Sequence, residues 1–353
     1  DDPRLQALSA WLATLPAALG LQIGSLRPAS ADASFRRYFR LDAEGRAPGI
    51  DAPLRTLIAM DAPPAREDSR PYVQVAALMH AAGLNVPRIV AQDLAQGFLL
   101  LTDLGTQTYL NAYLEPPTGA ERPDPDALMR AAIEALVVWQ QATRPAVLPP
   151  YDAALLNREL ALFPDWYVGR HLGHTLTDAQ RGVLDRTHAL LVSSALAQPA
   201  VYVHRDYMPR NLMLSTPTPG ILDFQDAVTG PVTYDIVSLM RDAFVSWDEE
   251  QVIDWTVRYW ERARKTGLLG STLGEDFGEF YRAFEWMGLQ RHLKVLGIFA
   301  RINYRDGKPQ YLADTPRFVR YVRGVTQRYA ALKPMAQLFD QLEGVAVNSG
   351  FTF

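Results

Sequence analysis

The order of apolar and polar positions predicts short strands first and helices afterwards. Apolar residues recur at helical spacing over residues 5–19, which predicts an amphipathic opening helix. After an expected loop at 28–34, strand patterns occupy residues 35–41, 56–60, 86–91 and 97–102, with one helix at 71–82. From residue 106 onward we expect helices at 127–143, 155–163, 177–195, 232–244, 249–266, 276–301 and 315–332. The pattern is typical of the α+β class.

One segment, residues 201–235, places polar chemistry between short apolar runs. A strand pattern at 200–203 leads into His204-Arg205-Asp206, and Asn211 comes five residues after that Asp. A second apolar run and a Pro/Gly turn then lead to Asp223. Such carboxylates and amides hold hard cations, and a carboxylate accepts a proton from a hydroxyl. The alternative is that Asp206 and Asn211 only close local turns. The joint spacing of all three residues favours chemistry.

Composition excludes several classes of protein. Of 353 residues, 48% are hydrophobic and 21% charged, as in an ordinary globular chain with one large domain or two lobes. A formal net charge of −4 offers no overall attraction to nucleic acid or to an anionic membrane. The absence of cysteine excludes disulfides, thiolate metal sites and a cysteine nucleophile. We expect a cytoplasmic protein without a membrane span, and no protein partner is implied.

The catalytic segment resembles the catalytic loop and metal-binding motif of protein-kinase-like phosphotransferases. This resemblance implies that Asp206 accepts the proton of an attacking hydroxyl, and that Asn211 and Asp223 hold Mg²⁺. It also implies a bilobal kinase-like fold. Its small, antiparallel-sheet N-terminal lobe would comprise residues 1–103, and its larger, mainly helical C-terminal lobe residues 104–353. In that fold the hinge between the lobes pairs with adenine, which assigns Thr102 and Leu104 to the adenine of ATP.

Longer strings narrow the resemblance. They are DASFRRYFR (32–40), MDAPP (60–64), GFLLLTDLGTQTYL (97–110), LFPDWYVGR (162–170), HRDYMPRNLM (204–213), FQDAVTGPVTYD (224–235) and QRHLKVLGIFARI (290–302). Together they are similar to the anomeric sugar kinases that convert N-acetylmuramate and N-acetylglucosamine to 1-phosphates in bacterial cell-wall recycling. The partners so implied are ATP and a small amino sugar. Two alternatives stay open: a kinase for an aminoglycoside, choline or another sugar, and a nucleotide-binding pseudokinase that acts as an interaction module.

The chain departs from the general kinase pattern at the phosphate-binding lysine. Met60 or Asp61 stands where that lysine is usual, and the expected helix at 71–82 has no suitable glutamate. The nearest cations are Arg36, Arg37 and Arg40, and we expect this group to contact the phosphates of ATP. Of the three, the sequence favours Arg40, because it lies inside the expected strand.

A second departure concerns the acceptor. Met208 stands where protein kinases carry a lysine, which argues against a protein substrate.

Sugar recognition is expected from the helical part, where aromatic rings stack on a pyranose and polar side chains read its hydroxyls. The candidates are Trp166, Tyr167, Gln290 and Arg291, each of which has a core or scaffold role as the alternative. Asp235 opens an apolar helix, so we expect it to support a loop from a first-turn position.

Overall fold

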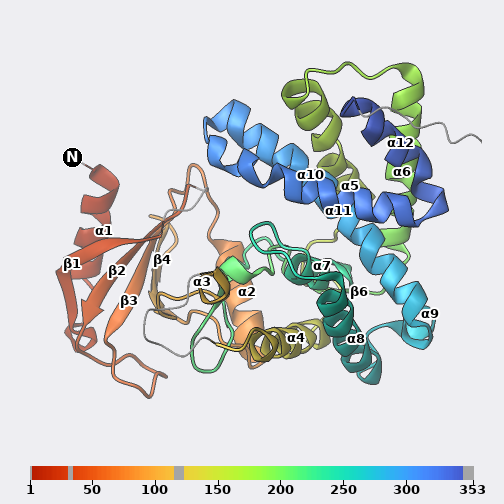
Figure 1. Ribbon diagram of the computed structural model, residues 1–353. Coiled ribbons are helices and arrows are strands. Elements are labelled where there is room, and N and C mark those ends of the chain that lie inside the picture. The colour runs from red at the N-terminus through yellow and green to blue at the C-terminus, as the bar shows by residue number, and fades with distance from the viewer. Residues whose placement is uncertain (1, 31–34, 115–122, 345–353) are drawn as a thin grey trace, which may run out of the picture. The chain divides into compact units, whose positions relative to one another are not determined.

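The computed structural model describes residues 2–30, 35–114 and 123–344, which fold into two compact units (Figure 1). The first unit comprises Asp1–Val138 and Arg210–Asp226, and the second comprises Trp139–Pro209 and Ala227–Phe353. A small antiparallel sheet in the first unit and a mainly helical second unit confirm the predicted class. The predicted lobes, residues 1–103 and 104–353, stay a prediction.

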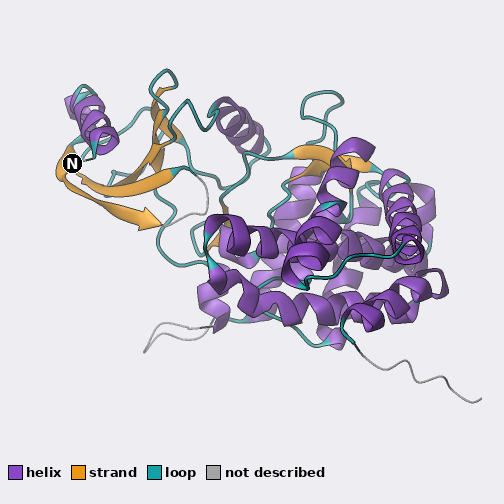
Figure 2. Ribbon diagram, turned by 90° about the horizontal axis from the view of Figure 1, so that it is seen from above, coloured by secondary structure: helices purple, strands orange, loops and turns teal. Residues whose placement is uncertain are grey.

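The strands of the first unit, drawn in orange in Figure 2, include a sheet in which every pair of neighbouring strands is antiparallel. Its strands follow in the order β1 (Leu21–Ser30), β2 (Arg37–Ala43), β3 (Thr56–Asp61), β5 (Phe98–Thr102) and β4 (Ile89–Asp93). Successive side chains on a strand point to opposite faces. On β2, Phe39 and Leu41 are therefore buried in the core, while Tyr38 and Arg40 face the other way and line a cavity.

Helix α1 (Pro3–Ala13) packs on the core face of this sheet. Asp2 caps its first turn by accepting hydrogen bonds from the backbone N–H groups of Arg4 and Leu5, each at 3.0 Å. Its buried residues include Leu8, Trp11 and Leu12, which share a hydrophobic cluster with β2, β3 and β5. Burial of each such side chain contributes about 1.5–3 kcal/mol.

Asp61, at the end of β3, connects α1 to the sheet by charge. Its side chain is completely buried and forms ion pairs with Arg4 of α1 and Arg37 of β2. The Arg37 guanidinium also binds the capping carboxylate of Asp2. A buried carboxylate is tolerated only with such partners, so these residues fasten the helix to the edge of the strands.

Residues 210–226 belong to the first unit although they lie far along the chain. They form a hairpin of β7 (Leu212–Met213) and β8 (Gly220–Ile221). The N–H of Leu214 donates to the carbonyl of Gln107 at 2.9 Å, and the N–H of Ile221 donates to that of Asn85 at 2.8 Å. The Asn85 side chain donates to the carbonyl of Pro217 at 2.6 Å. The other helices of this unit are η1 (Ala17–Leu19), α2 (Arg70–Ala81), α3 (Tyr109–Leu114) and η3 (Pro209–Asn211), with α4 (Pro125–Gln141) running into the second unit.

The second unit packs helices around α10 (Phe277–Asp306), whose side chains are mostly buried between residues 280 and 300. The remaining elements are α5 (Ala153–Leu160), the π-helix η2 (Phe163–His171), α6 (Asp178–Leu196), α7 (Tyr234–Met240), α8 (Glu249–Lys265), α9 (Gly270–Glu275), η4 (Pro309–Asp314), α11 (Thr315–Arg328), η5 (Ala330–Leu332) and α12 (Lys333–Leu342), with strands β6 (Ala200–Val203) and β9 (Val228–Pro231). A Cβ atom at Gly297 would lie 2.4 Å from the carbonyl carbon of Leu162. Glycine is therefore required where α10 crosses the segment that leads into η2.

Several predicted elements are corrected by the structure. The expected loop at 28–34 is wrong for residues 28–30, which belong to β1, and residues 31–34 lie outside the described part. The expected helix at 155–163 ends at Leu160 and is followed by the π-helix. Strands β1 and β9 and helices α9 and α12 were not foreseen. None of the helices in the described ranges has the length and apolar character needed to cross a membrane.

We predict that Asp61→Asn lowers the free energy of unfolding by about 2–3 kcal/mol, measured by urea denaturation. The loss of charge leaves two guanidinium groups without their buried partner, although the partly exposed Arg4 and Arg37 soften the effect. The matched control is Arg27→Ala, which breaks an ion pair with Asp42 whose side chains are 46% and 43% exposed. It should cost less than about 1 kcal/mol. Equal losses in the two variants would contradict the anchoring role of Asp61.

Candidate functional site

The turn that follows β6 carries the first predicted catalytic residue, Asp206. The backbone N–H groups of His204 and Arg205 donate to the two carboxylate oxygens of Asp235, at 2.6 and 3.0 Å. The N–H of Asp206 donates to Nδ1 of the buried His204 at 3.1 Å, and the N–H of Met208 donates to the carbonyl of Asp206 at 2.9 Å. These bonds fix the turn, while the Asp206 side chain lies at a partly exposed position.

Asp235 stands in the first turn of α7 and supports this turn, as predicted. Burial raises the pKa of Asp235 to about 7, although the two backbone donors act in the opposite direction. A carboxylate held so deeply is structural rather than available to a ligand.

Asn211 and Asp223, the predicted metal ligands, are brought together within the first unit. The Asn211 side-chain amide donates to Asp223 at 3.4 Å, and the Gln225 amide donates to the other Asp223 oxygen at 2.6 Å. The N–H of Leu222 donates to the Asn211 carbonyl at 2.9 Å. Asp223 has φ 58°, a left-handed conformation that is uncommon for a residue with a side chain and that recurs at functional sites.

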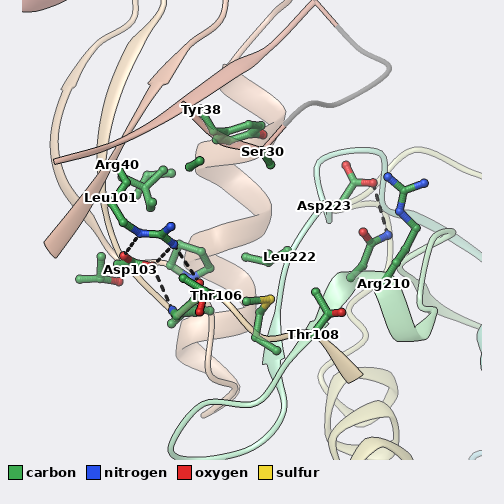
Figure 3. Close-up of a pocket in the computed structure, with 18 of the residues that line it drawn as sticks. Ser30, Tyr38, Arg40, Leu101, Asp103, Thr106, Thr108, Arg210, Leu222 and Asp223 are labelled. Atoms are coloured by element: carbon green, nitrogen blue, oxygen red, sulfur yellow. Dashed lines mark hydrogen bonds and ion pairs between the residues drawn. The ribbon is translucent and has the colours of Figure 1, made fainter. Parts of the chain in front are cut away.

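A cavity of about 360 Å³ opens beside these residues (Figure 3). Its apolar walls include Ile58, Pro87, Leu101, Met213 and Leu222, and its polar lining includes Ser30, Tyr38, Arg40, Asp103, Thr106, Thr108, Arg210, Asn211 and Asp223. The volume lies in the range of small-molecule sites. The apolar walls suit a flat ring. The end lined by Asp223, Asn211 and Arg210 suits an anionic group together with a metal cation.

Thr102 and Leu104, the predicted adenine contacts, both line this cavity. Thr102 ends β5, where its N–H donates to the carbonyl of Arg88 at 2.9 Å and its hydroxyl accepts from the N–H of Arg88 at 2.8 Å. These two bonds fix the backbone that faces the cavity.

The predicted phosphate-binding arginines lie in three different environments. Arg40 lines the cavity, but its guanidinium binds both Asp103 oxygens, at 2.6 and 3.0 Å, and the carbonyl of Gly105 at 3.0 Å. Figure 3 shows this guanidinium turned toward Asp103. Arg37 projects to the opposite face, toward Asp61. Both guanidinium groups are therefore paired with carboxylates.

Arg36 directly precedes β2, and its side chain is largely buried. It forms an ion pair with Glu67 at 3.3 Å, and the two side chains are only 11% and 18% exposed. Burial acts against its charge, but Tyr38, Glu67, Asp223 and Asp226 outweigh burial and raise the pKa of Arg36. Asp223, one of the two predicted metal ligands, is thus among the charges that favour the charged form of Arg36.

Sequence reasoning missed two contributors to this region. Glu67 was overlooked because it precedes α2, where a partner glutamate was sought inside the helix. Arg210 lines the cavity and lies next to Asp223 in Figure 3. Its position directly before Asn211 was the available signal, since neighbours on a short loop are carried to the same place.

The predicted sugar-binding residues divide into two groups. Gln290 and Arg291 are buried on α10, where Arg291 donates to the carbonyl of Arg205 at 3.2 Å. Trp166 and Tyr167 lie on η2. The Tyr167 ring is buried and stacks on the ring of Phe163, with 5.4 Å between the ring centroids. Arg291 thus contacts the turn that carries Asp206, while the Gln290 amide donates to Glu159 at 3.5 Å.

Comparison with known proteins places this chain among phosphotransferases. The model of the Phosphotransferase enzyme family matches residues 25–269. The N-acetylmuramate/N-acetylglucosamine kinase of Pseudomonas putida is 50% identical over 98% of this chain and 98% of that protein. The kinase of the same name from Pseudomonas aeruginosa is 51% identical over 97% and 98%, and that from Neisseria meningitidis is 48% identical over 92% and 93%.

Solved structures show the same fold at low identity. A choline/ethanolamine kinase family protein from Mesorhizobium loti aligns with a TM-score of 0.58 and 14% identity, covering 96% of this chain and 99% of that one. The ADP-bound aminoglycoside phosphotransferase APH(2'')-Ib aligns with a TM-score of 0.56 and 12% identity, covering 91% and 98%. These likenesses confirm the kinase-like fold.

Glu159, which binds the side chain of Arg205, provides a pH-dependent prediction. Burial alone would raise its pKa, but Lys294 and Arg205 lower it from 4.5 to about 2. The folded state therefore favours the charged carboxylate. Its stabilisation, about 3 kcal/mol, is complete above pH 4.5 and is lost as the pH falls toward 2.

We therefore predict that Glu159→Gln is less stable than the wild type at pH 7, and that the difference shrinks by about 1–1.5 kcal/mol at pH 3.5. Urea denaturation at the two pH values measures this change. The control is Glu279→Gln, which breaks an ion pair with Arg282; the side chains of Arg282 and Glu279 are 51% and 39% exposed. This variant should lose less than about 0.5 kcal/mol of unfolding free energy at both pH values. A difference for Glu159→Gln that does not change with pH would contradict the prediction.

Proposed function

Because this chain belongs to the phosphotransferase enzyme family, we propose that it transfers the γ-phosphoryl group of ATP to the anomeric hydroxyl of N-acetylmuramate and N-acetylglucosamine. The observation that carries the proposal is the identity of about half of all residues, over nearly the whole chain, to kinases named for these sugars. The products would be the sugar 1-phosphates, which we assign to peptidoglycan recycling in the bacterial cytoplasm.

Asp206 is proposed to accept the proton of the attacking hydroxyl. As the anomeric oxygen forms its bond to the γ-phosphorus, the bond to the leaving ADP oxygen breaks and the proton passes to the carboxylate. A hemiacetal hydroxyl is more acidic than an ordinary alcohol, so a carboxylate is a sufficient base. The hydrogen bonds around His204 and Asp235 hold the turn that presents this group.

The cavity of the first unit is proposed to bind ATP, with Thr102 and Leu104 toward the adenine. Asn211 and Asp223 fit a magnesium ion, since Mg²⁺ binds through one or two carboxylates together with substrate phosphates. When bound there, Mg²⁺ neutralises negative charge on the triphosphate. Arg210 lines the same end of the cavity and adds a positive charge to it.

Arg36 is proposed to supply the phosphate-binding cation that β3 lacks. All three arginines form ion pairs, Arg37 with Asp61, Arg40 with Asp103 and Arg36 with Glu67. Arg36 differs in that Asp223 is one of the charges that favour its charged form. Glu67 holds it from the side of α2. The proposal therefore moves from Arg40, which the sequence favoured, to Arg36.

The acceptor site is proposed to lie in the helical unit, with Trp166, Tyr167 and Gln290 as the candidates. Arg291, the fourth candidate from the sequence, is buried and donates to the carbonyl of Arg205, so we propose that it supports the turn instead. Likeness to choline and aminoglycoside kinases rests on identities of 12–14% and does not favour those acceptors. Retention of Asp206, Asn211 and Asp223 opposes a pseudokinase.

Asp206→Asn should reduce sugar-dependent ADP formation at least about 1,000-fold while ATP affinity changes less than threefold, because the substitution keeps the shape and removes the base. The assay follows ADP release with each of the two sugars, with choline and with an aminoglycoside, and identifies the product by phosphorus NMR. Asp254→Asn, in an exposed ion pair with Arg258, is the control and should retain full activity. Turnover by Asp206→Asn near that of the control would show that Asp206 is not the base.

Arg36→Ala should raise the KM for ATP about 10- to 100-fold, as expected when a charged hydrogen bond to phosphate is lost. Arg36→Lys should recover part of the affinity, because the charge returns without the two-pronged geometry. Arg37→Ala is the matched control: it should lower the unfolding midpoint and leave the KM for ATP unchanged, since its guanidinium binds Asp61 and Asp2. An unaltered KM in Arg36→Ala would show that other groups hold the triphosphate.

A further inference from the structure

Arg205, the residue before Asp206, has an unusual backbone conformation. Its φ is 79°, in the left-handed region, and it carries a long side chain. Such a conformation costs on the order of 1 kcal/mol or more and persists only where the surroundings impose it. Because Asp206 follows directly, the dihedral angles of Arg205 set the direction in which the Asp206 carboxylate points.

Contacts hold Arg205 at its N–H, its carbonyl and its side chain. The N–H donates to Asp235 at 3.0 Å, and the carbonyl accepts from Nη1 of Arg291 at 3.2 Å. The guanidinium binds Glu159 and lies over the ring of Tyr151 at 5.4 Å. A residue held at three points cannot relax to an ordinary backbone angle without breaking one of them.

Glu159 links these contacts into one network. Beside Arg205, its carboxylate binds Nζ of Lys294 at 2.8 Å and the hydroxyl of Tyr151. Lys294 also donates to the hydroxyl oxygen of Tyr234 at 3.1 Å, and Arg291 donates to that same oxygen at 3.2 Å. The path from the Arg205 side chain through Glu159, Lys294 and Tyr234 thus returns by Arg291 to the Arg205 carbonyl. Helices α5, α7 and α10 each contribute to this closed ring.

Breaking this network is destabilising, but assembling it is also costly, because its charges must leave water. The exposed fractions of the Glu159 and Lys294 side chains are 8% and 10%, so both charges have lost most of their hydration. Apolar packing of similar volume often stabilises a core as well or better than buried ion pairs. What a charged network provides instead is one defined geometry, because each donor and acceptor has a required direction.

We propose that Glu159 and Arg291 are positioning residues that hold Arg205 in its left-handed conformation and thereby aim the Asp206 carboxylate at the acceptor hydroxyl. This proposal rests on the proposed function, in which Asp206 is the base. In this proposal neither Glu159 nor Arg291 contacts the γ-phosphoryl group. Asp206 is nonetheless one of the charges that favour the charged form of Arg291, so the two side chains lie in one electrostatic environment.

The test is steady-state kinetics of Glu159→Gln and Arg291→Lys in the full-length protein. Misdirection of the base should lower kcat about 10- to 100-fold, while the KM values for ATP and sugar and the affinity for ADP stay within about threefold. Glu279→Gln on α10 is the charge-matched control and should keep the wild-type kcat. Thermal unfolding of each variant establishes that it is folded at the assay temperature.

The double variant Glu159→Gln with Arg205→Met separates positioning from independent effects. If Glu159 acts through Arg205, the double variant loses no more kcat than the more damaged of the two single variants, Glu159→Gln and Arg205→Met. A loss of kcat in the double variant equal to the product of the two single losses overturns the proposal. A kcat within twofold of the wild type in folded Glu159→Gln or folded Arg291→Lys also overturns it. If Glu159→Gln does not fold, Arg291→Lys decides alone.

Arg291→Lys also discriminates against direct sugar binding. A raised KM for the sugar with an unchanged kcat would return Arg291 to acceptor recognition and overturn its positioning role. Failure of the proposed function is visible separately, because the wild type would then form no sugar phosphate. The variant-to-wild-type ratio of kcat tests positioning with any acceptor that the wild type uses.

Discussion

A carboxylate buried away from water must be matched by donors, and this requirement organises both units. Asp61 gathers Arg4 and Arg37 and so fixes α1 on the sheet. Asp235 accepts hydrogen bonds from the backbone N–H groups of the turn that carries Asp206. Glu159 binds the side chains of Arg205 and Lys294. Each carboxylate is costly to bury alone. Each carboxylate therefore fixes the positions of the groups that bind it, and fixed positions are what give a site a defined geometry.

The predicted catalytic residue and the predicted metal ligands belong to different units. The chain passes from the second unit into the first between Pro209 and Arg210. Asp206 is consequently held by the helical core, through α7, while Asn211 and Asp223 are held by the hairpin that contacts Gln107 and Asn85. Left-handed backbone at Arg205 and at Asp223 marks both places. Strain stored at these points is sustained by surrounding hydrogen bonds rather than by local preference.

The parts of this arrangement that the sequence revealed are those encoded by short spacing. Asp206, Asn211 and Asp223 follow a recognisable interval. Alternating aromatic and basic residues identified β2, and short apolar runs identified β3 and β5. Strand β1 was missed because its pairing with β2 shifts register between Gln22 and Arg27, which interrupts the alternation. The partners of Arg37 and Arg40 were not predictable either. Asp103 lies 63 residues from Arg40 in the sequence, and only the antiparallel register brings them together.

The alternation of side chains along β2 and β3 limits which arginine can take the role that we propose in place of the lysine that β3 lacks. Met60 pairs with Tyr38, and Asp61 pairs with Arg37. Because directly paired residues share a face, Met60 lies on the cavity side, and Asp61 lies on the side of α1. On β2, a cation that faces the cavity must stand at an even position, as Arg40 does, which excludes Arg37. Asp103 and the carbonyl of Gly105 already occupy the guanidinium of Arg40. Arg36, which directly precedes β2 and pairs with Glu67, is the candidate that we propose. With no lysine at this place in β3, Asp61 anchors the helix instead.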